Sequence, residues 1–225
     1  MTTTTSKIQP KKPYRGPPME GFMASWYAKI TKSDRHHERA VEVASRVPAG
    51  GSILEVAPGP GYFAIELAKL GNYRVSGLDV SKAFVRIASE NARAAGVKVE
   101  FKQGDAAHLP YPERSFDFVA CTAAFKNFSD PQGALAEIYR VLKPGGHASI
   151  VDLRKDASRE EIRQMIDEMH LSAVSALWTR LTFRFFLLKN AYEKQAIERL
   201  AADSPFRGCE LANEGIQFDL RLAKN

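Results

Sequence analysis

The stretch that decides the fold runs from residue 52 to residue 64 and reads Ser52-Ile53-Leu54-Glu55-Val56-Ala57-Pro58-Gly59-Pro60-Gly61-Tyr62-Phe63-Ala64. An apolar run that predicts a strand leads here into a Gly-x-Gly turn, and a helical pattern follows at once. A strand that turns directly into a helix places backbone N–H groups and a helix N-terminus around a small concavity at the carboxyl edge of a sheet. That geometry suits a nucleotide-like ligand.

Strand and helix patterns alternate downstream of this turn. We expect strands over residues 52–57, 73–79, 97–102, 116–122 and 147–153, with helices over 62–70, 82–95 and 131–142 and a turn at 143–146. Two helices are expected before the first strand, one within 19–30 and one from Ser33 or Asp34 to about Val47. Residues 158 to about 192 are expected to be helical, and the tail forms an antiparallel pair around Asn213-Glu214-Gly215. This alternation predicts an α/β, doubly wound, Rossmann-like fold with a mostly parallel sheet and helices on both faces.

Length and composition limit the number of domains and the kinds of partner that the chain can have. The 225 residues suffice for one α/β domain and are too few for two ordinary enzyme domains. Residues 1–18 are expected to be a disordered basic tail, and 19–225 a single domain in which 19–47 and 156–192 are helical segments covering the site. The net charge of +6 leaves room for an anionic partner.

The spacing of the two cysteines and the length of the apolar runs indicate the cellular compartment and whether the chain binds a metal or spans a membrane. Cys121 and Cys209 lie far apart without metal-type spacing, so we expect reduced thiols, no metal site and a cytoplasmic protein. No uncharged apolar run reaches the ~18–20 residues that a membrane span needs.

Two ligands compete for the glycine turn. The pattern Gly59-x-Gly61-x-x-Ala64 satisfies the loose dinucleotide form, and Asp79 ends the next strand, where a ribose-binding acid belongs for either ligand. Three features favour S-adenosylmethionine over NAD. Glu55 precedes Gly59 by four positions and can attract a methionine ammonium. Asp105 follows the third strand and can accept from an adenine amino group, and no second domain remains for the substrate of a dehydrogenase.

Five motifs in this order carry a family resemblance: Ile-Leu-Glu-Val-Ala-Pro-Gly-Pro-Gly, Gly-Leu-Asp-Val-Ser, Gln-Gly-Asp-Ala, Phe-Asp-Phe-Val and Arg-Val-Leu-Lys-Pro-Gly-Gly. Over roughly residues 50–153 the chain resembles class I S-adenosylmethionine-dependent methyltransferases. It is most similar to the ubiquinone/menaquinone C-methyltransferase-like group (methyltransferase type 11). The resemblance implies a seven-stranded sheet with one antiparallel strand near its edge. Ala57 departs from the family pattern, in which many members carry a glycine.

The resemblance also implies roles for single residues. Glu55 and the backbone of Ala57, Gly59 and Gly61 would face the methionine end of S-adenosylmethionine, whose product is S-adenosylhomocysteine. Asp79 would bind the ribose hydroxyls and Val80 would pack on the adenine. Gly104, Asp105 and Ala106 would lie at the adenine edge, with the Cys121 carbonyl near the sulfonium. A structural interpretation stays open for the acids, because Glu55 could cap a turn and Asp79 or Asp105 could cap the following helix.

The acceptor side is less specified, and we expect a small, apolar or aromatic acceptor. Methyl transfer depends largely on holding two reactants in line, and a base is needed only if the nucleophile must lose a proton. Candidate catalytic groups are His36, His37 and Asp152, and candidate acceptor-binding residues are Tyr27, Phe125, Lys126, Phe128 and Trp178.

Several alternatives remain open from the sequence. An RNA methyltransferase and a non-catalytic cofactor-binding scaffold are the other two functions. The loop after the fourth strand lacks the Asn/Asp-Pro-Pro-Phe/Tyr motif of amino-directed nucleic-acid methyltransferases, which argues against nucleic acid. Residues 171–192 could be a lid, the interface of a homodimer or a peripheral contact with an anionic membrane.

Overall fold

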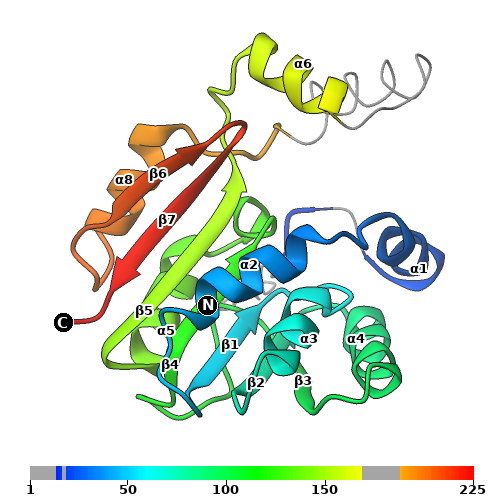
Figure 1. Cartoon of the computed structure of the whole chain (residues 1–225). Coiled ribbons are helices and arrows are strands. Elements are labelled where there is room, and N and C mark those ends of the chain that lie inside the picture. Colours follow the sequence, from blue (N-terminus) through cyan, green and yellow to red (C-terminus); the bar gives the residue numbers. More distant parts are fainter. Residues whose placement is uncertain (1–13, 17–18, 169–187) are drawn as a thin grey trace, which may run out of the picture.

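The structure, a computed structural model, describes residues 14–16, 19–168 and 188–225. Within these residues seven strands form one sheet in the order β3-β2-β1-β4-β5-β7-β6 (Figure 1). The strands are β1 Ser52–Val56, β2 Arg74–Asp79, β3 Val99–Gln103, β4 Phe116–Thr122, β5 Leu142–Leu153, β6 Glu210–Glu214 and β7 Gln217–Ala223. Because β7 runs antiparallel to both of its neighbours, the expected mostly parallel sheet with one antiparallel strand near its edge is confirmed.

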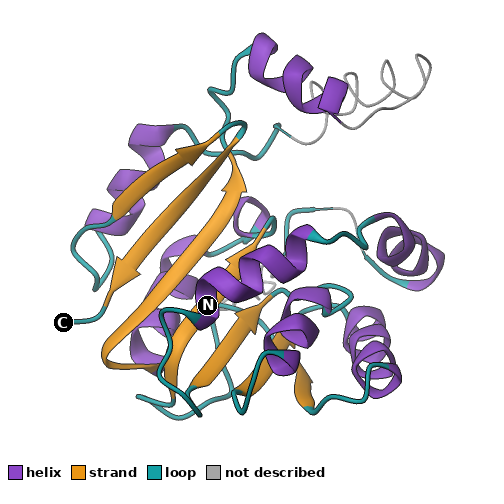
Figure 2. Ribbon diagram, in the orientation of Figure 1, coloured by secondary structure: helices purple, strands orange, loops and turns teal. Residues whose placement is uncertain are grey.

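Helices cover both faces of the sheet (Figure 2). They are α1 Gly21–Ile30, α2 Arg35–Ala44, α3 Tyr62–Lys69, α4 Lys82–Ala94, the short 3-10 helix η1 Phe125–Asn127, α5 Pro131–Val141, α6 Arg159–Glu168 and α8 Lys194–Ala202. Successive residues of a strand point to opposite faces, and β1 shows this directly. Leu54 and Val56 pack in the cluster that contains α5 and α8, whereas Ile53 packs with α2 and α3.

Capping residues explain where two of the helices start. The Ser81 hydroxyl accepts a hydrogen bond from the Phe84 backbone N–H at 3.1 Å, which caps α4. Asp130 caps α5 through the Gly133 N–H at 2.8 Å, and Pro131 occupies the first turn, where its missing N–H costs nothing. Asp34 stands at the N-cap of α2, but its side chain makes no capping hydrogen bond.

Two sequence expectations about element boundaries are wrong, and one helix was missed. The turn expected at 143–146 belongs to β5. Gly145 N–H donates to the Lys224 carbonyl, and Lys224 N–H donates to the Gly146 carbonyl. These two bonds extend the pairing of β5 with the C-terminal segment. The helical segment expected to reach about residue 192 does not, since Tyr192 forms a parallel bridge with Arg154. Helix α8 was not expected at all, although Ile197 and Ala201 are buried in the core. Residues 169–187, which include Trp178 and most of the segment 171–192, lie outside the described residues.

A buried polar network fastens α2 to the C-terminal hairpin. The fully buried carboxylate of Asp219 on β7 accepts from the Ser149 hydroxyl at 2.5 Å and from Arg221 Nε at 2.8 Å. Arg39 on α2 donates to the same Ser149 hydroxyl and lies 3.4 Å from the Asp219 carboxylate. One carboxylate therefore joins two strands and a helix that are distant in sequence.

Replacing this carboxylate should destabilise the fold. Asp219→Ala leaves Arg39 and Ser149 without their buried acceptor, and we expect the free energy of unfolding to fall by about 3 kcal/mol. Urea denaturation measures the loss. The control Asp203→Ala removes an exposed carboxylate and should stay within about 0.5 kcal/mol of the parent. A loss at Asp219 no larger than that at Asp203 would contradict the role of the network.

Candidate functional site

The loop between β1 and α3 lies where the sheet changes direction of growth, because β1 has β2 on one side and β4 on the other. Gly59 and Gly61 take left-handed backbone conformations, with φ of 53° and 79°. A Cβ on Gly61 would lie 2.8 Å from the Cβ of Ala88, so glycine is required there for packing. A Cβ on Gly59 would meet no protein atom within 4 Å, so this position opens on free space at the carboxyl end of β1.

Two alanines at the strand ends carry the same unusual conformation. Ala57 follows β1 with φ 58°, and Ala123 follows β4 with φ 59°. A left-handed conformation costs an L-residue about 1–2 kcal/mol, and such strain is concentrated at functional sites. Backbone hydrogen bonds hold both residues, from Ala57 N–H to the Leu78 carbonyl at 2.8 Å and from Ala123 N–H to that of Val151 at 2.7 Å. The departure from glycine at Ala57 therefore leaves the loop conformation in place.

Asp79 ties this loop to the end of β2. Its buried carboxylate accepts from Gly59 N–H at 3.0 Å and from Ser81 N–H at 2.8 Å. Burial raises the pKa of Asp79 to about 6, the two backbone hydrogen bonds oppose this, and the charge of Glu20 adds to it. A carboxylate offers about four acceptor positions, so two of them remain for a ligand that donates hydroxyl groups.

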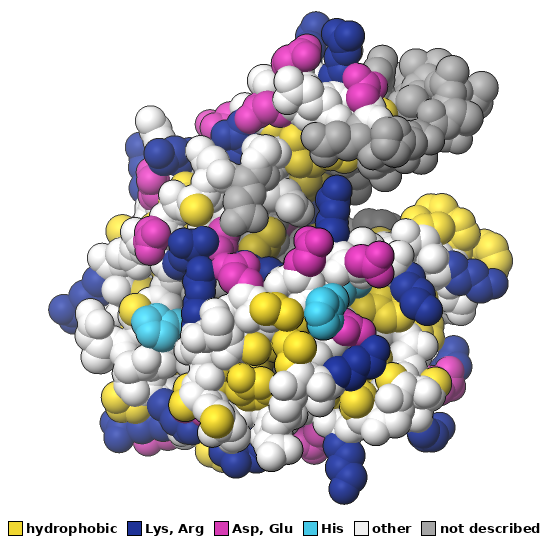
Figure 3. All heavy atoms as spheres, viewed as in Figure 1, with side chains coloured by type: hydrophobic (Ala, Val, Ile, Leu, Met, Phe, Trp, Pro, Cys, Tyr) yellow, Lys and Arg dark blue, Asp and Glu magenta, His cyan; other side chains and the backbone are white. Residues whose placement is uncertain are grey.

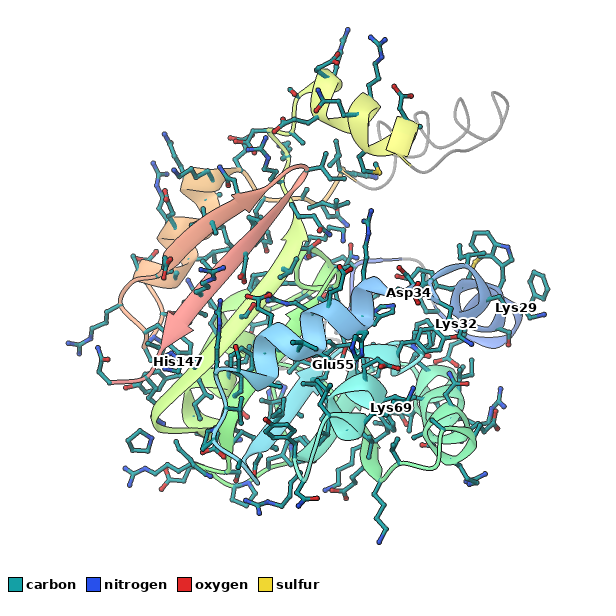
Figure 4. The ribbon with its side chains drawn as sticks, in the orientation of Figure 1. Lys29, Lys32, Asp34, Glu55, Lys69 and His147 are labelled. Atoms are coloured by element: carbon teal, nitrogen blue, oxygen red, sulfur yellow. The ribbon has the colours of Figure 1, made fainter. Side chains whose placement is uncertain are left out.

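Glu55 lies in the interior at the end of β1 (Figure 4). Its Oε2 accepts from Ala64 N–H of α3 at 3.1 Å, so the acid joins the strand to the helix across the glycine turn. Burial raises the pKa of Glu55 to about 8, and the Ala64 hydrogen bond only partly offsets this. In the free protein this side chain is therefore mostly protonated at neutral pH.

The residues after β3 complete the same edge. Gly104 N–H donates to the Asp79 carbonyl at 3.0 Å, and a Cβ on Gly104 would lie 2.8 Å from Leu78, so glycine is needed there for close approach. Asp105 uses one carboxylate oxygen to accept from Ala107 N–H at 3.0 Å and so caps a turn. The interpretation of Asp105 as a helix cap is wrong, because residues 106–108 form a turn and no helix lies between β3 and β4. The neighbouring Val80 is half-buried, and Ala106 is buried.

A buried ion pair lies at the ends of β4 and β5. Asp152 is fully buried, and its carboxylate accepts from Lys126 Nζ at 2.7 Å and from the Lys126 backbone N–H at 2.8 Å. Lys126 Nζ also donates to the Ala123 carbonyl at 3.0 Å. The two residues that the sequence placed on the catalytic and acceptor sides are thus partners of one another. On β4 itself, burial raises the pKa of the Cys121 thiol, so the thiol is neutral.

Tyrosines link the two halves of this edge. Burial raises the pKa of Tyr14 to about 12, and the charges of Asp79 and Asp152 both contribute. Burial also raises the pKa of Tyr27 on α1, again with contributions from Asp152 and Asp79. Both phenols therefore stay protonated and lie within electrostatic reach of the acids on β2 and β5. Tyr14 also contacts Asn127 through its hydroxyl at 3.0 Å.

The contact between Tyr14 and Asn127 was missed by sequence reasoning. The bridge between Tyr14 and Phe128, which brings the N-terminal segment onto the loop after β4, joins residues more than one hundred positions apart. The only local signal was the aromatic character of Tyr14 within a polar segment.

The two candidate histidines lie away from the cluster around Asp152, and the two candidate phenylalanines lie in the core. His36 Nε2 lies 2.9 Å from the Thr31 carbonyl, and His37 Nδ1 lies 3.0 Å from Glu66 of α3, so both histidines contact groups outside the cluster around Asp152. Phe125 is fully buried and Phe128 nearly so; their ring centroids are 5.3 Å apart. Phe125 also packs against Tyr192 at 5.8 Å, so these rings support the site from the core side.

Part of the chain is similar to known proteins. Residues 54–150 match the family described as a methyltransferase domain. A protein named demethylmenaquinone methyltransferase, from Deinococcus radiodurans, is 37% identical over 126 residues, which cover 56% of this chain and 52% of the relative. The chain thus spans about half the length of the curated relatives it matches.

Solved structures share the fold. A protein described as a candidate S-adenosylmethionine-dependent methyltransferase, from Methanococcus maripaludis, aligns with a TM-score of 0.74 at 22% identity, covering 90% of this chain and 92% of that one. A SAM-dependent methyltransferase from Aquifex aeolicus aligns with a TM-score of 0.69 at 20% identity, covering 91% of this chain and 100% of that one. The expected fold class and family resemblance are confirmed.

The buried acid on β1 gives a test of the site's electrostatics. A raised folded-state pKa means that Glu55 stabilises the fold fully below pH ~4.5, and that this stability is lost as pH rises through about 8. Glu55→Gln cannot ionise. We expect it to gain free energy of unfolding relative to the parent between pH 5 and pH 9, by a few kcal/mol in total, since one pKa unit corresponds to about 1.4 kcal/mol.

Chemical denaturation at pH 5, 7 and 9 measures this difference. The control Glu90→Gln, on the exposed side of α4, should show no such trend. A difference that stays constant with pH, or reverses, would show that Glu55 is ionised in the free protein.

Proposed function

We propose that this chain, whose residues 54–150 match a methyltransferase domain, is a class I S-adenosylmethionine-dependent methyltransferase that transfers a methyl group to a small, largely apolar aromatic acceptor. One observation carries the cofactor part of the proposal. The Asp79 carboxylate sits at the end of β2, held by two backbone N–H groups, beside a glycine whose missing side chain leaves open space. An acceptor of paired hydroxyl groups next to a glycine loop is the arrangement that binds a nucleoside.

The residues present fit the cofactor. Asp79 keeps free acceptor positions for the two ribose hydroxyls, and the backbone of Ala57, Gly59 and Gly61 would line the methionine end. Asp105 and Ala106 would bind the adenine edge, with Val80 against its face. When bound, the cofactor supplies a methyl group on a sulfonium centre, which a nucleophile can attack in line.

Glu55 would respond to the charge of the cofactor. In the free protein, burial holds its pKa near 8. A cationic ammonium nearby favours the ionised carboxylate and lowers that pKa. Binding would then release a proton near neutral pH.

The acceptor would lie over β4 and β5. The groups available there would be neutral hydrogen-bond donors rather than unpaired charges. Tyr14 and Tyr27 are protonated phenols within electrostatic reach of Asp152. The charges of Asp152 and Lys126 are satisfied by one another. Such surroundings favour an aromatic ring with oxygen substituents that can accept from a phenol. The name of the Deinococcus relative, demethylmenaquinone methyltransferase, points to the same class of acceptor.

The contribution of the chain to catalysis would be mainly positional. Holding the nucleophile and the methyl carbon in line at about 3 Å can supply much of the acceleration. The Lys126–Asp152 pair fixes the 3-10 helix η1 at the end of β4, so it positions the loop beside the acceptor. Asp152 accepts hydrogen bonds from both the backbone and the side chain of Lys126, and we propose no proton transfer to it.

Removing the Asp79 carboxylate tests the cofactor site. We expect Asp79→Asn to weaken S-adenosylhomocysteine binding at pH 7.5 by roughly ten- to a hundredfold, since hydrogen bonds to a charged group contribute about 1.5–3 kcal/mol. The affinity of the parent should also fall as pH drops below about 6, where the carboxyl of Asp79 becomes protonated and offers fewer acceptor positions. The variant should lack this loss of affinity below pH 6 and keep only the pH dependence that the Glu55 proton contributes.

Titration calorimetry between pH 5 and pH 8 measures both effects. The control Asp34→Asn changes an exposed carboxylate on the α2 side and should leave the affinity unchanged (Figure 4). Parent-like affinity and pH dependence in Asp79→Asn would remove Asp79 from the site.

An acceptor panel tests the reaction. With methyl-labelled cofactor, we expect label in apolar aromatic compounds that carry ring oxygens, and none in transfer RNA. Tyr27→Phe should lower kcat/KM by about tenfold through the loss of one phenol hydrogen bond, with S-adenosylhomocysteine affinity unchanged. The control Tyr73→Phe, whose hydroxyl donates to the Ala44 carbonyl, should leave kcat/KM unchanged. Label in RNA alone would contradict the proposed acceptor, and no label in any compound would favour a scaffold without catalysis.

A further inference from the structure

Helix α1 has apolar side chains on two opposite faces. Ala24 and Ala28 are buried against Phe84 and Ile87 of the neighbouring α4. The outer side chains are exposed by 84% at Phe22, 45% at Met23, 48% at Trp26 and 57% at Ile30. At about 100° per residue these four fall within an arc of about 100°, directed away from the buried alanines.

This outer face of α1 (Phe22, Met23, Trp26 and Ile30) differs from the rest of the described surface. The other large hydrophobic side chains exposed there, Val41 and Leu70, stand singly on other elements. Isolated exposed apolar residues are ordinary, whereas a contiguous group marks a surface that binds something. Figure 3 shows the apolar side chains gathered over α1 at one side of the molecule.

The charge of the same region indicates the partner. Residues 1–35 contain seven basic and two acidic side chains, so +5 of the net +6 falls in this part of the sequence. Lys29 and Lys32, at the C-terminal end of α1, are exposed and make no ion pair within the described residues (Figure 4). Of the two acids, Glu20 accepts from the Ala83 N–H. Bulky apolar side chains beside unpaired lysines are typical of a helix that lies in the interface of an anionic membrane.

The helix also belongs to the candidate site. Tyr27 contacts Phe84 of α4 with a ring-centroid distance of 5.8 Å and lies within electrostatic reach of Asp79 and Asp152. The Ala28 carbonyl accepts from the Tyr62 hydroxyl at 2.8 Å, which joins α1 to α3 just after the glycine loop. One helix therefore contributes to the site with one side and is exposed and apolar on the other.

We propose that the outer face of α1 docks on an anionic lipid surface, with Phe22, Trp26 and Ile30 in the headgroup region and Lys29 and Lys32 at the lipid phosphates. A second copy of the chain fits less well, because a symmetric pair would bring the unpaired Lys29 and Lys32 of both copies together. RNA fits less well because the exposed face is apolar. Docking goes beyond methyl transfer and does not depend on it, but it would place the site next to a membrane-dissolved acceptor.

Vesicle binding tests the docking. The sequence has two tryptophans, so Trp178→Phe leaves Trp26 as the sole tryptophan reporter. With vesicles of equal parts phosphatidylcholine and phosphatidylglycerol, Trp26 emission should shift to shorter wavelength and the protein should sediment with the lipid. Phe22→Ser with Ile30→Ser should weaken binding at least about tenfold, since each removes apolar area from the headgroup region. Lys29→Gln should weaken binding to these vesicles about fivefold.

The matched control is Val41→Ser, because Val41 is as exposed as Trp26 but lies on α2. It should bind vesicles as the parent does. Calorimetry with S-adenosylhomocysteine on the same preparations shows whether the cofactor site is intact, so failure to dock and failure of the proposed function are separate results.

Three outcomes would overturn the proposal. The first is no sedimentation with anionic vesicles while the cofactor site is intact. The second is a dimer in light scattering that Phe22→Ser with Ile30→Ser dissociates, together with no vesicle binding, which would assign the face to a second copy. The third is RNA binding that these substitutions weaken, again without vesicle binding.

Discussion

The site depends on the two hydrogen bonds that the Asp79 carboxylate accepts from Gly59 and Ser81. One links the end of β2 to the glycine loop after β1, and the other holds the turn into α4. The carboxylate is buried although burial raises its pKa to about 6, so the fold holds an acid where its charged form is disfavoured. A group that is costly to bury and only partly satisfied by the protein is typical of a binding position.

A second constraint comes from the N-terminal segment. Residues around Tyr14 pair with the loop after β4, and α1 packs on α4, so this segment reaches from the end of β4 to the helix that follows β2. Its tyrosines supply neutral donors near two acids. The Lys126–Asp152 pair then fixes the loop after β4, and the charges of these two residues are paired with one another.

The periodic part of the fold could be predicted from the sequence. Alternating apolar runs and helix caps such as Ser81 are local signals, and strand β4 was predicted with the bounds that the structure shows. The C-terminal hairpin was predicted from the alternation of apolar and polar residues on either side of Gly215. Helix α8 and the extension of β5 were missed, because the first depends on packing of Ile197 and Ala201 and the second on pairing with Lys224. The placement of Glu55 and Asp79 near the ends of β1 and β2 followed from the strand pattern, whereas the partnership of Lys126 with Asp152 and the position of Tyr14 depend on long-range contacts that no local pattern encodes.

The most direct measurement is a crystal structure of the chain with S-adenosylhomocysteine. The account predicts both ribose hydroxyls within about 2.5–3.2 Å of the Asp79 carboxylate oxygens, with the thioether tail extending over the loop of residues 57–61 toward β4. A nucleoside bound with its ribose away from Asp79, or a tail directed away from β4, would contradict it.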